Sequence, residues 1–257
     1  MPAAAEAAAG KKKGKRVRNK ILVFGDSITY GQLDPEMGGW VNRLRLNIAN
    51  DSSIVSCHVF NMGISGQSSG EILERMEREC RGRVMDDANN IIVIACGIND
   101  TRIVNGSTLA SEGEFRKNVS SLISCAGGIA DHVICAGLTP VDESRTNPVW
   151  WDRSQNWRND YIRRYDEIIK EVCSEEGVRY VRLYDLIDAE SNGDGLHPSA
   201  AGHAAIADVM TSVIYEYLNR EGSFAAIAKP AGIRVLPGRI IRRIRKIRKT
   251  KRIKRIR

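Results

Sequence analysis

Four consecutive apolar residues, Ile21 to Phe24, lead directly into Gly25, Asp26 and Ser27. A strand with no alternating polar side is typical of a parallel sheet that is covered on both faces, because such a strand leaves no face for water. The glycine that follows lets the backbone turn sharply without a Cβ clash. Asp26 and Ser27 are therefore expected at the carboxyl end of a buried strand, the edge at which open α/β sheets bind ligands. The same two residues could simply cap the next helix, so the rest of the chain must decide.

Apolar runs and amphipathic stretches alternate along the chain after this first strand. A strand is short and apolar, whereas a helix of ten or more residues repeats its apolar positions every three or four. The expected strands cover residues 21–24, 54–60, 91–95, 133–138 and 178–183. The expected longer helices cover residues 40–49, 69–81, 115–126, 157–176 and 200–218. Because strands that alternate with helices form parallel βαβ crossovers, the chain is predicted to be an α/β protein with a three-layer α/β/α domain and a five-stranded parallel sheet.

The formal net charge of +8 is carried by the two ends of the chain. Residues 1–20 hold seven lysines and arginines against one acid, and residues 229–257 hold fourteen and no acid, so residues 21–228 have a net charge of −12. Residues 1–19 are therefore predicted to be a disordered basic segment, residues 20–222 the folded domain and residues 223–257 a basic tail. The tail either contacts a polyanion, such as an anionic lipid surface or a nucleic acid, or stays solvated.

The six cysteines include no Cys-x-x-Cys pair, so we expect free structural thiols and no metal site. No apolar run reaches the ~18 residues of a membrane-spanning helix. The alanine-rich start lacks the leucine and valine core of a secretory signal. These features favour a cytoplasmic protein, peripheral to a membrane only through its basic tail.

Three more polar clusters are expected at the rim that carries Ser27. Gly63 and Asn99 follow the second and third strands, and the carboxyl ends of parallel strands share one edge of a sheet. Asp194 and His197 lie between the last strand and the last helix, and a proline at the start of that helix holds His197 outside it. A serine hydroxyl becomes a nucleophile when a base removes its proton, and an imidazole, with an ordinary pKa near ~6.5, is suited to this. Ser27, His197 and Asp194 are therefore predicted to act as nucleophile, base and orienting carboxylate.

Two further sets of residues are assigned around this predicted triad. The attack of a serine on an ester carbonyl produces an oxyanion, which needs hydrogen-bond donors that are already in place. The predicted donors are the backbone N–H groups of Ser27 and Gly63 and the side-chain amide of Asn99. Trp150 and Trp151 fall in the long connection after the fourth strand, where they either wall a substrate pocket or pack that loop against the body.

Four blocks of the sequence carry a resemblance to a known family. In chain order they are Gly25-Asp26-Ser27-Ile28, Gly63, Gly97-Ile98-Asn99-Asp100 and Asp194-Gly195-Leu196-His197-Pro198. Over roughly residues 20–220 the chain resembles the SGNH hydrolases, also called GDSL esterases and lipases, with Ile28 where the family name gives leucine. The resemblance implies a flavodoxin-like fold, an acyl-enzyme on Ser27, no metal or organic cofactor, and a small-molecule substrate that is a carboxylic ester, a thioester or a carbohydrate acetyl ester.

Two other functions stay open on the sequence alone. The acyl group could pass to an alcohol instead of water, which would make the chain an acyltransferase. Alternatively, the SGNH scaffold is inert, and the basic ends dock the chain on polyanions as a non-enzymatic adaptor. Of the remaining polar residues near the rim, Asp26 and Asp100 are expected to cap a helix or brace a loop, and His203 to serve packing or lie at the surface.

Overall fold

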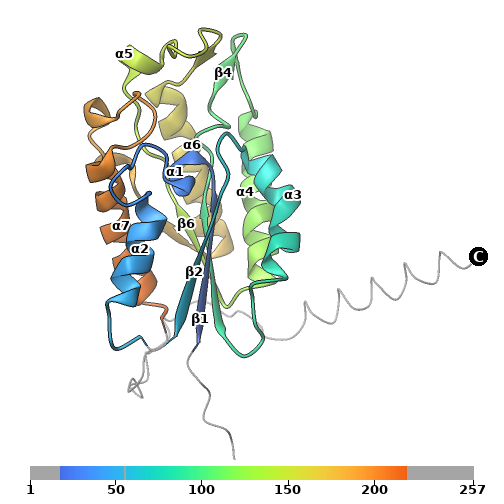
Figure 1. Cartoon of the computed structure of the whole chain (residues 1–257). Helices are drawn as coiled ribbons and strands as arrows, with labels where there is room; N and C mark the ends of the chain where they lie inside the picture. The colour runs from blue at the N-terminus through green and yellow to red at the C-terminus, as the bar shows by residue number, and fades with distance from the viewer. Residues whose placement is uncertain (1–17, 55, 219–257) are drawn as a thin grey trace, which may run out of the picture.

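A computed structural model describes residues 18–54 and 56–218 of the chain (Figure 1). At its centre is a parallel sheet of five strands in the order β2-β1-β3-β6-β8. In that order the strands span Cys57–Gly63, Asn19–Gly25, Asn89–Ala95, His132–Ala136 and Arg179–Val181. The predicted fold class, an α/β protein built on a five-stranded parallel sheet, is confirmed.

Helices cover both faces of this sheet, which gives the predicted three layers (Figure 1). One face carries α2 and α7, and the opposite face carries α3, α4 and α6. These five helices span, in that order, Trp40–Ala49, Ala200–Tyr215, Ser69–Cys80, Glu112–Gly127 and Asn159–Glu176.

The position of β1 in the fold explains the uninterrupted apolar run of residues 21–24. Ile21 and Val23 pack into the core beneath α2 and α7, whereas Leu22 and Phe24 pack into the core beneath α3, α4 and α6. All four side chains are fully buried. A strand whose two faces are both covered has no position for a polar side chain along its covered length, and β1 has none from Ile21 to Phe24.

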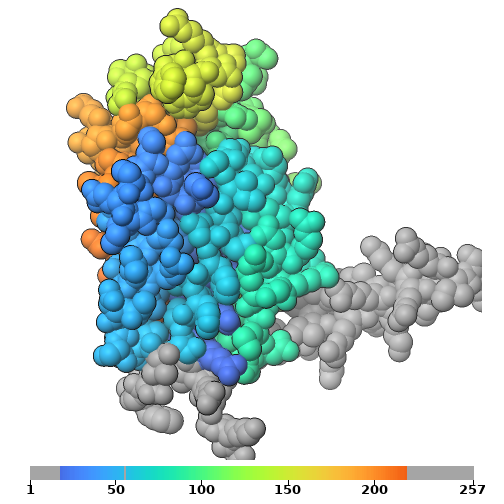
Figure 2. Space-filling view, in the orientation of Figure 1, coloured from blue at the N-terminus to red at the C-terminus, as the bar shows by residue number. Residues whose placement is uncertain are grey.

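Short elements gather at the carboxyl end of the main sheet, the upper end in Figure 1. Helix α1 follows β1 directly, α5 follows β6, and a second, antiparallel sheet has the order β5-β4-β7. Two 3₁₀ turns, η1 and η2, precede α7. Their bounds are Ser27–Tyr30 for α1, Glu143–Thr146 for α5, Ser107–Thr108 for β5, Ile103–Val104 for β4, Gln155–Asn156 for β7, Tyr184–Leu186 for η1 and Ala189–Ser191 for η2. In Figure 2 the yellow-green segment between β6 and α6 forms this end of the molecule.

Strand β2 differs from its predicted position. It spans residues 57–63 instead of 54–60, and its register pairs Gly25 with Gly63. β2 is an edge strand of which Met62 alone is fully buried, so its apolar residues did not mark where pairing begins and ends. Helix α6 also begins later than predicted, because Trp157 belongs to the connection that precedes it.

The described chain begins and ends at the amino edge of the sheet, opposite the short elements (Figure 1). Asn89, the first residue of β3, donates from Nδ2 to Asn19 Oδ1 at 2.9 Å and to the carbonyl oxygen of Tyr217 at 2.8 Å. Asn19 is fully buried as the first residue of β1, so the folded domain starts before the predicted residue 20. The predicted basic segments, apart from residues 18 and 19, lie outside the described residues. None of the described helices is long and apolar enough to cross a membrane.

Candidate active site

Ser27 stands where β1 gives way to α1. Gly25 makes this junction possible, because a Cβ there would lie 2.1 Å from Thr29 Oγ1 and 2.4 Å from the carbonyl oxygen of Ala95. Asp26 caps α1 by accepting a hydrogen bond from the Ile28 N–H at 3.0 Å. The turn leaves Ser27 as the first helical residue at the carboxyl edge of the sheet, with 5% of its surface exposed.

His197 reaches Ser27 across 170 positions of sequence. Its Nε2 lies 2.8 Å from Ser27 Oγ, and its Nδ1 lies 2.6 Å from Asp194 Oδ2. A carboxylate can only accept here, so Nδ1 carries the hydrogen and Nε2 is left to accept from the serine hydroxyl. The structure thus joins the predicted nucleophile, base and orienting carboxylate in one hydrogen-bonded chain. Their catalytic roles stay a prediction.

Asp194 is held as an anion by the same loop that presents His197. Its Oδ1 accepts the N–H groups of Leu196 at 2.9 Å and His197 at 2.8 Å, while its Oδ2 faces the imidazole. Burial acts to raise the pKa of Asp194, but these hydrogen bonds and the nearby imidazole outweigh it, so the pKa lies below its ordinary value. The carboxylate can therefore orient the imidazole and stabilise it when it becomes charged.

The predicted oxyanion donors are only partly brought together. Ser27 and Asn99 line one cleft, and Asn99 Nδ2 donates one hydrogen to the carbonyl oxygen of Gln67 at 3.1 Å. None of the described residues accepts its second hydrogen. Gly63 does not line this cleft, and its N–H donates to Asn61 Oδ1 at 2.9 Å. The assignment of Gly63 as an oxyanion donor is therefore wrong for this structure.

Gly66 occupies the place that Gly63 was predicted to fill. It lines the cleft with Ser27 and Asn99, and its N–H makes no hydrogen bond to the described residues. Its φ of +83° belongs to the left-handed region that favours glycine. Gly63 is a glycine for another reason, since a Cβ there would lie 2.3 Å from the backbone nitrogen of Tyr30. The signal for Gly66 was a second glycine three residues further along the same loop.

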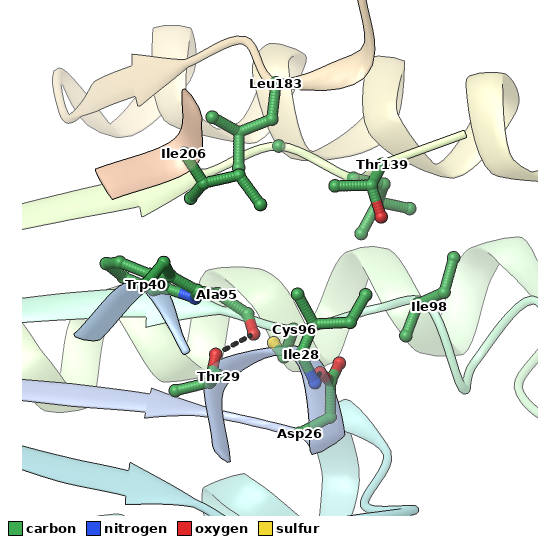
Figure 3. Close-up of a pocket in the computed structure, with 12 residues that line it drawn as sticks. Asp26, Ile28, Thr29, Trp40, Ala95, Cys96, Ile98, Thr139, Leu183 and Ile206 are labelled. Atoms are coloured by element: carbon green, nitrogen blue, oxygen red, sulfur yellow. Dashed lines mark hydrogen bonds between the residues drawn. The ribbon is translucent and has the colours of Figure 1, made fainter. Parts of the chain in front are cut away.

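The cleft around Ser27 has a volume of about 470 Å³. Its walls mix polar groups with leucine and tryptophan side chains, namely Ser27, Gln32, Leu33, Ser65, Gly66, Asn99, Arg102, Trp150, Trp151, Gln155, Trp157, Asp194, Leu196 and His197. A second cavity, between the turn at Asp26 and Thr139, has only about 20 Å³ and is too small for a substrate (Figure 3).

The three tryptophans of the long connection have different surroundings. Trp150 is 74% exposed and Trp151 is 40% exposed, and their rings meet edge to face with 5.7 Å between centroids. Trp157 is buried, and its Nε1 donates to the carbonyl oxygen of Ile98 at 2.9 Å. Trp150 and Trp151 therefore line the mouth of the cleft, and Trp157 anchors the loop to the turn that carries Asn99.

Asp26 and Asp100 are fixed by backbone and serine donors beside the site. Asp100 accepts from the N–H of Ser69 at 2.9 Å and from Ser69 Oγ at 2.5 Å, which ties the loop after β3 to α3. Burial raises the pKa of Asp26 to about 7 and that of Asp100 to about 6. The structure agrees with the expectation that these two residues cap a helix and brace a loop.

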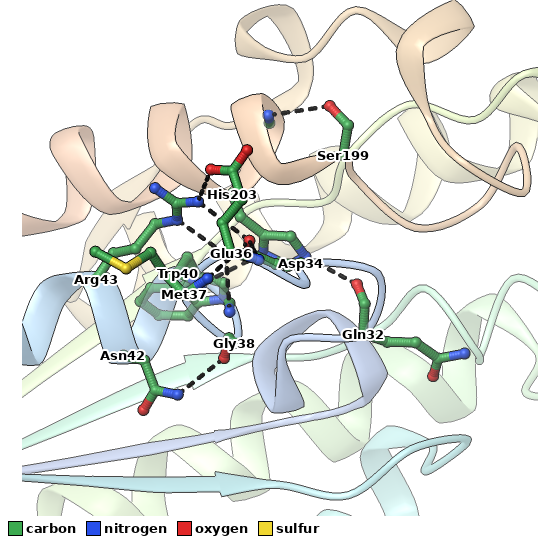
Figure 4. A network of polar contacts seen from close by, with 12 residues as sticks. Gln32, Asp34, Glu36, Met37, Gly38, Trp40, Asn42, Arg43, Ser199 and His203 are labelled. Carbon is green, nitrogen blue, oxygen red and sulfur yellow. Dashed lines mark hydrogen bonds and ion pairs between the residues drawn. The ribbon is translucent and has the colours of Figure 1, made fainter.

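His203 is a buried structural residue. Its Nδ1 accepts from the N–H of Trp40 at 3.3 Å, and its Nε2 donates to the carbonyl oxygen of Gln32 at 3.0 Å (Figure 4). Desolvation lowers the pKa of His203, which keeps the ring neutral. Of the two expectations for this residue, packing is correct and a surface position is wrong. Asp34 and Arg43, 2.9 Å apart, complete this network, which fixes the loop between α1 and α2 against α7.

Arg75 was not singled out from the sequence, although it joins two of the turns at the rim. This buried side chain of α3 donates from one terminal nitrogen to the carbonyl oxygens of Met62 at 2.7 Å and Gly25 at 3.4 Å. Its Nε donates to Gln67 Oε1 at 2.6 Å, and Glu79 balances its charge at 3.2 Å. A lone arginine in a charged amphipathic helix gives no sign in the sequence that it points inward.

The cysteines and the other possible metal ligands of the described residues do not gather into a metal site. Within them, no group of three or more His, Cys, Asp or Glu side chains is placed to hold a metal ion. All six cysteines lie in this part of the chain and are free, as predicted. Burial raises the pKa of Cys57 and Cys80 to about 12, so these thiols resist ionisation. The absence of a cofactor stays a prediction.

Residues 23–205 match the model of the GDSL-like lipase/acylhydrolase family, and the chain belongs to this family. Among curated proteins, it is 25% identical over 233 residues to the uncharacterized protein YpmR of Bacillus subtilis strain 168, covering 83% of this chain and 88% of that one.

Solved structures of similar architecture include a lipase/acylhydrolase from Enterococcus faecalis, with a TM-score of 0.64 and 23% identity over 79% of this chain and 98% of that one. Another is the acetylxylan esterase Axe2 from Geobacillus stearothermophilus, with a TM-score of 0.61 and 19% identity over 80% and 99% of the two chains. These neighbours share the fold, and the SGNH resemblance read from the sequence blocks is confirmed.

Proposed function

We propose that this protein is a carboxylic ester hydrolase that forms an acyl-enzyme on Ser27. Family membership supports ester hydrolysis in general, and one observation supports the specific mechanism. This is the unbroken hydrogen-bonded chain from Asp194 through His197 to Ser27, with distances of 2.6 Å and 2.8 Å. Such a chain at the floor of an open cleft is what nucleophilic catalysis by a serine needs.

The first half of the proposed reaction acylates the serine. His197 Nε2 takes the hydroxyl proton as Ser27 Oγ forms a bond to the ester carbonyl carbon, and the carbonyl oxygen becomes an oxyanion. When the carbonyl reforms, the bond to the alcohol oxygen breaks and His197 returns the proton to that alcohol. In the second half, His197 deprotonates a water molecule that attacks the acyl carbon, and the acid leaves as Ser27 regains its proton.

The oxyanion is held in this proposal by three donors from different turns of the rim. They are the N–H groups of Ser27 and Gly66 and the free amide hydrogen of Asn99, all in the walls of the same cleft. Each donor of this kind typically contributes about 10²- to 10³-fold in rate. Arg75 and the Gln67 carbonyl keep these turns in place.

The proposal is tested with p-nitrophenyl esters from acetate to long chain and with a fluorophosphonate that reacts with activated serines. Wild-type protein should hydrolyse at least the short esters, and Ser27→Ala should lower kcat/KM by about 10³-fold or more while circular dichroism stays unchanged. Peptide mass spectrometry should find the phosphonate on Ser27. Ser52→Ala, at an exposed position, is the matched control and should behave as wild type. Turnover at the wild-type rate by folded Ser27→Ala would refute the proposal.

A further inference from the structure

Arg102 and Gln155 are placed in the cleft by the small second sheet. Arg102 follows Asn99 by one turn and directly precedes β4, and β4 pairs with β7 so that Val104 lies opposite Gln155. Both Arg102 and Gln155 line the same cleft as Ser27 and His197. The second sheet therefore brings a permanent positive charge to the cleft, on the side where the turn with Asn99 lies.

The guanidinium of Arg102 is half-buried, and none of the described residues neutralises it at close range. Among the described residues its one side-chain hydrogen-bond partner is the neutral amide oxygen of Gln155, at a long 3.5 Å, and its buried Nε has no acceptor. Within the described chain no carboxylate oxygen lies within 4.0 Å of it. Two other arginines held inside the fold are paired with acids, since Arg43 has Asp34 at 2.9 Å and Arg75 has Glu79 at 3.2 Å.

Two acids that feel the charge of Arg102 are engaged elsewhere. Asp152 and Glu71 interact with Arg102 electrostatically without forming an ion pair. Asp152 accepts from Gln155 Nε2 at 2.6 Å, which turns the amide oxygen of Gln155 toward Arg102, and Glu71 is bound to the Ser68 cap of α3. Most of the five N–H donors of the guanidinium are thus unused inside a partly apolar cleft, an arrangement that costs free energy unless an anion completes it.

We propose that Arg102 binds an anionic group, a carboxylate or a phosphate, carried by the ester substrate. The planar guanidinium suits both groups because it can offer two parallel N–H donors to a pair of oxygens. Gln155 positions the guanidinium, and Asp152 positions Gln155. The inference rests on the proposed esterase function for its substrate and adds that the preferred ester is acidic.

The kinetic test compares two esters of equal acyl length, p-nitrophenyl valerate and mono-p-nitrophenyl glutarate, which differ by a terminal carboxylate. Wild-type protein should prefer the glutarate, and Arg102→Gln should lower the ratio of the two kcat/KM values by about 10-fold or more, because charge-assisted hydrogen bonds are lost. Hydrolysis of the valerate should change less than about 3-fold. Arg102→Lys should restore part of the preference, and Arg153→Gln, at an exposed position of the same end, should leave it unchanged. A ratio that is equal in wild type and Arg102→Gln overturns the proposal.

A binding test decides the same question without turnover. In a Ser27→Ala background, tryptophan fluorescence reports on the cleft through Trp150, Trp151 and Trp157. Butyrate and butyl phosphate should each quench or shift this signal at lower concentration than butanol, and Arg102→Gln should weaken the two anions by about 10-fold or more. The anion that binds more tightly identifies the group, and inorganic phosphate shows whether the alkyl chain is needed. Anion binding that is absent, or that survives in Arg102→Gln, overturns the proposal. If the wild-type protein hydrolysed none of the esters but Arg102 still bound the anions, only the esterase function would be refuted.

Discussion

His197 and His203 show how one residue type acquires two roles at positions only six residues apart. His197 has an acid three positions earlier that fixes its ring, so its second nitrogen is turned toward Ser27. Both ring nitrogens of His203 form hydrogen bonds with backbone groups at the two ends of the loop between α1 and α2. From the sequence, His197 was preferred to His203 as the base because Asp194 lies within one turn of it, and a carboxylate at that distance can orient an imidazole.

Asp100 gives a residue-scale prediction for the pH dependence of stability. Its pKa is about 6 in the folded protein and 3.8 in an unfolded chain, so the folded state holds more protons between those values. Stability contributed by this group is therefore present at low pH and is lost as the pH rises through that window. Asp100→Asn removes the titration, and the free energy of unfolding of the variant relative to wild type should rise by about 1 kcal/mol between pH 5 and pH 8.

Urea denaturation at the two pH values measures this difference. Asp86→Asn, at an exposed position, is the control and should follow the wild-type pH dependence. A wild-type to Asp100→Asn difference that stays the same at pH 5 and pH 8 would show that the Asp100 carboxyl titrates as it does in water.

At the scale of elements, strands were predictable from sequence where both faces are buried and poorly predictable at the edge that β2 forms. β1 and β3 lie within two residues of their predicted limits, since every side chain in them must be apolar or locally paired. β2 has one neighbouring strand, and its limits are set by pairing with β1 and not by its own hydrophobicity. The predicted end of β2 was three residues too early, at residue 60 instead of 63. Gly63 was therefore placed in the loop after the strand and assigned as an oxyanion donor.

Helix α3 gives the element-scale prediction, because its Arg75 holds the ends of β1 and β2 together. Arg75→Met keeps an apolar stem but removes the donors to Met62, Gly25 and Gln67. We expect kcat for p-nitrophenyl acetate to fall by about 10-fold or more with KM little changed, since the lost contacts position the oxyanion turns and do not touch substrate.

Steady-state kinetics well below the melting temperature separate this effect from a loss of folded protein. Arg78→Met, at an exposed position on the same helix, is the matched control and should keep wild-type kcat. If Arg75→Met lost stability but kept kcat, Arg75 would serve the fold alone.

At the scale of the whole molecule, the fold and the convergence of Ser27, His197 and Asp194 were predictable, but the wall of the cleft that the second sheet supplies was not. The second sheet consists of two-residue strands, which are too short to leave a periodic pattern in the sequence. Arg102, Gln155 and Trp157 depend on that sheet for their places in the cleft. Their convergence follows from tertiary pairing, so no local signal marks it.

The position of the described chain ends predicts what the basic segments contribute. Asn89, the first residue of β3, donates its N–H to the carbonyl oxygen of Arg18 at 2.9 Å and its side-chain amide to that of Tyr217. Both ends of the described chain therefore lie at the amino edge of the sheet, whereas Ser27 lies at the carboxyl edge (Figure 1). A protein of residues 18–218 should therefore hydrolyse p-nitrophenyl acetate with kcat/KM within about 3-fold of the full chain, because the small soluble ester meets only the cleft. Kinetics of both proteins at low and high salt check this, and a drop of more than 10-fold in the short protein would give the basic segments a part in turnover.

Asn89 binds the first residue of β1 and the carbonyl of Tyr217 with one amide group. The first and last described residues of the domain consequently lie next to each other. A short glycine-rich bridge between them, with a new break at the exposed Asn105–Gly106 turn, would reorder the chain as a circular permutant while every strand of the main sheet keeps its partners.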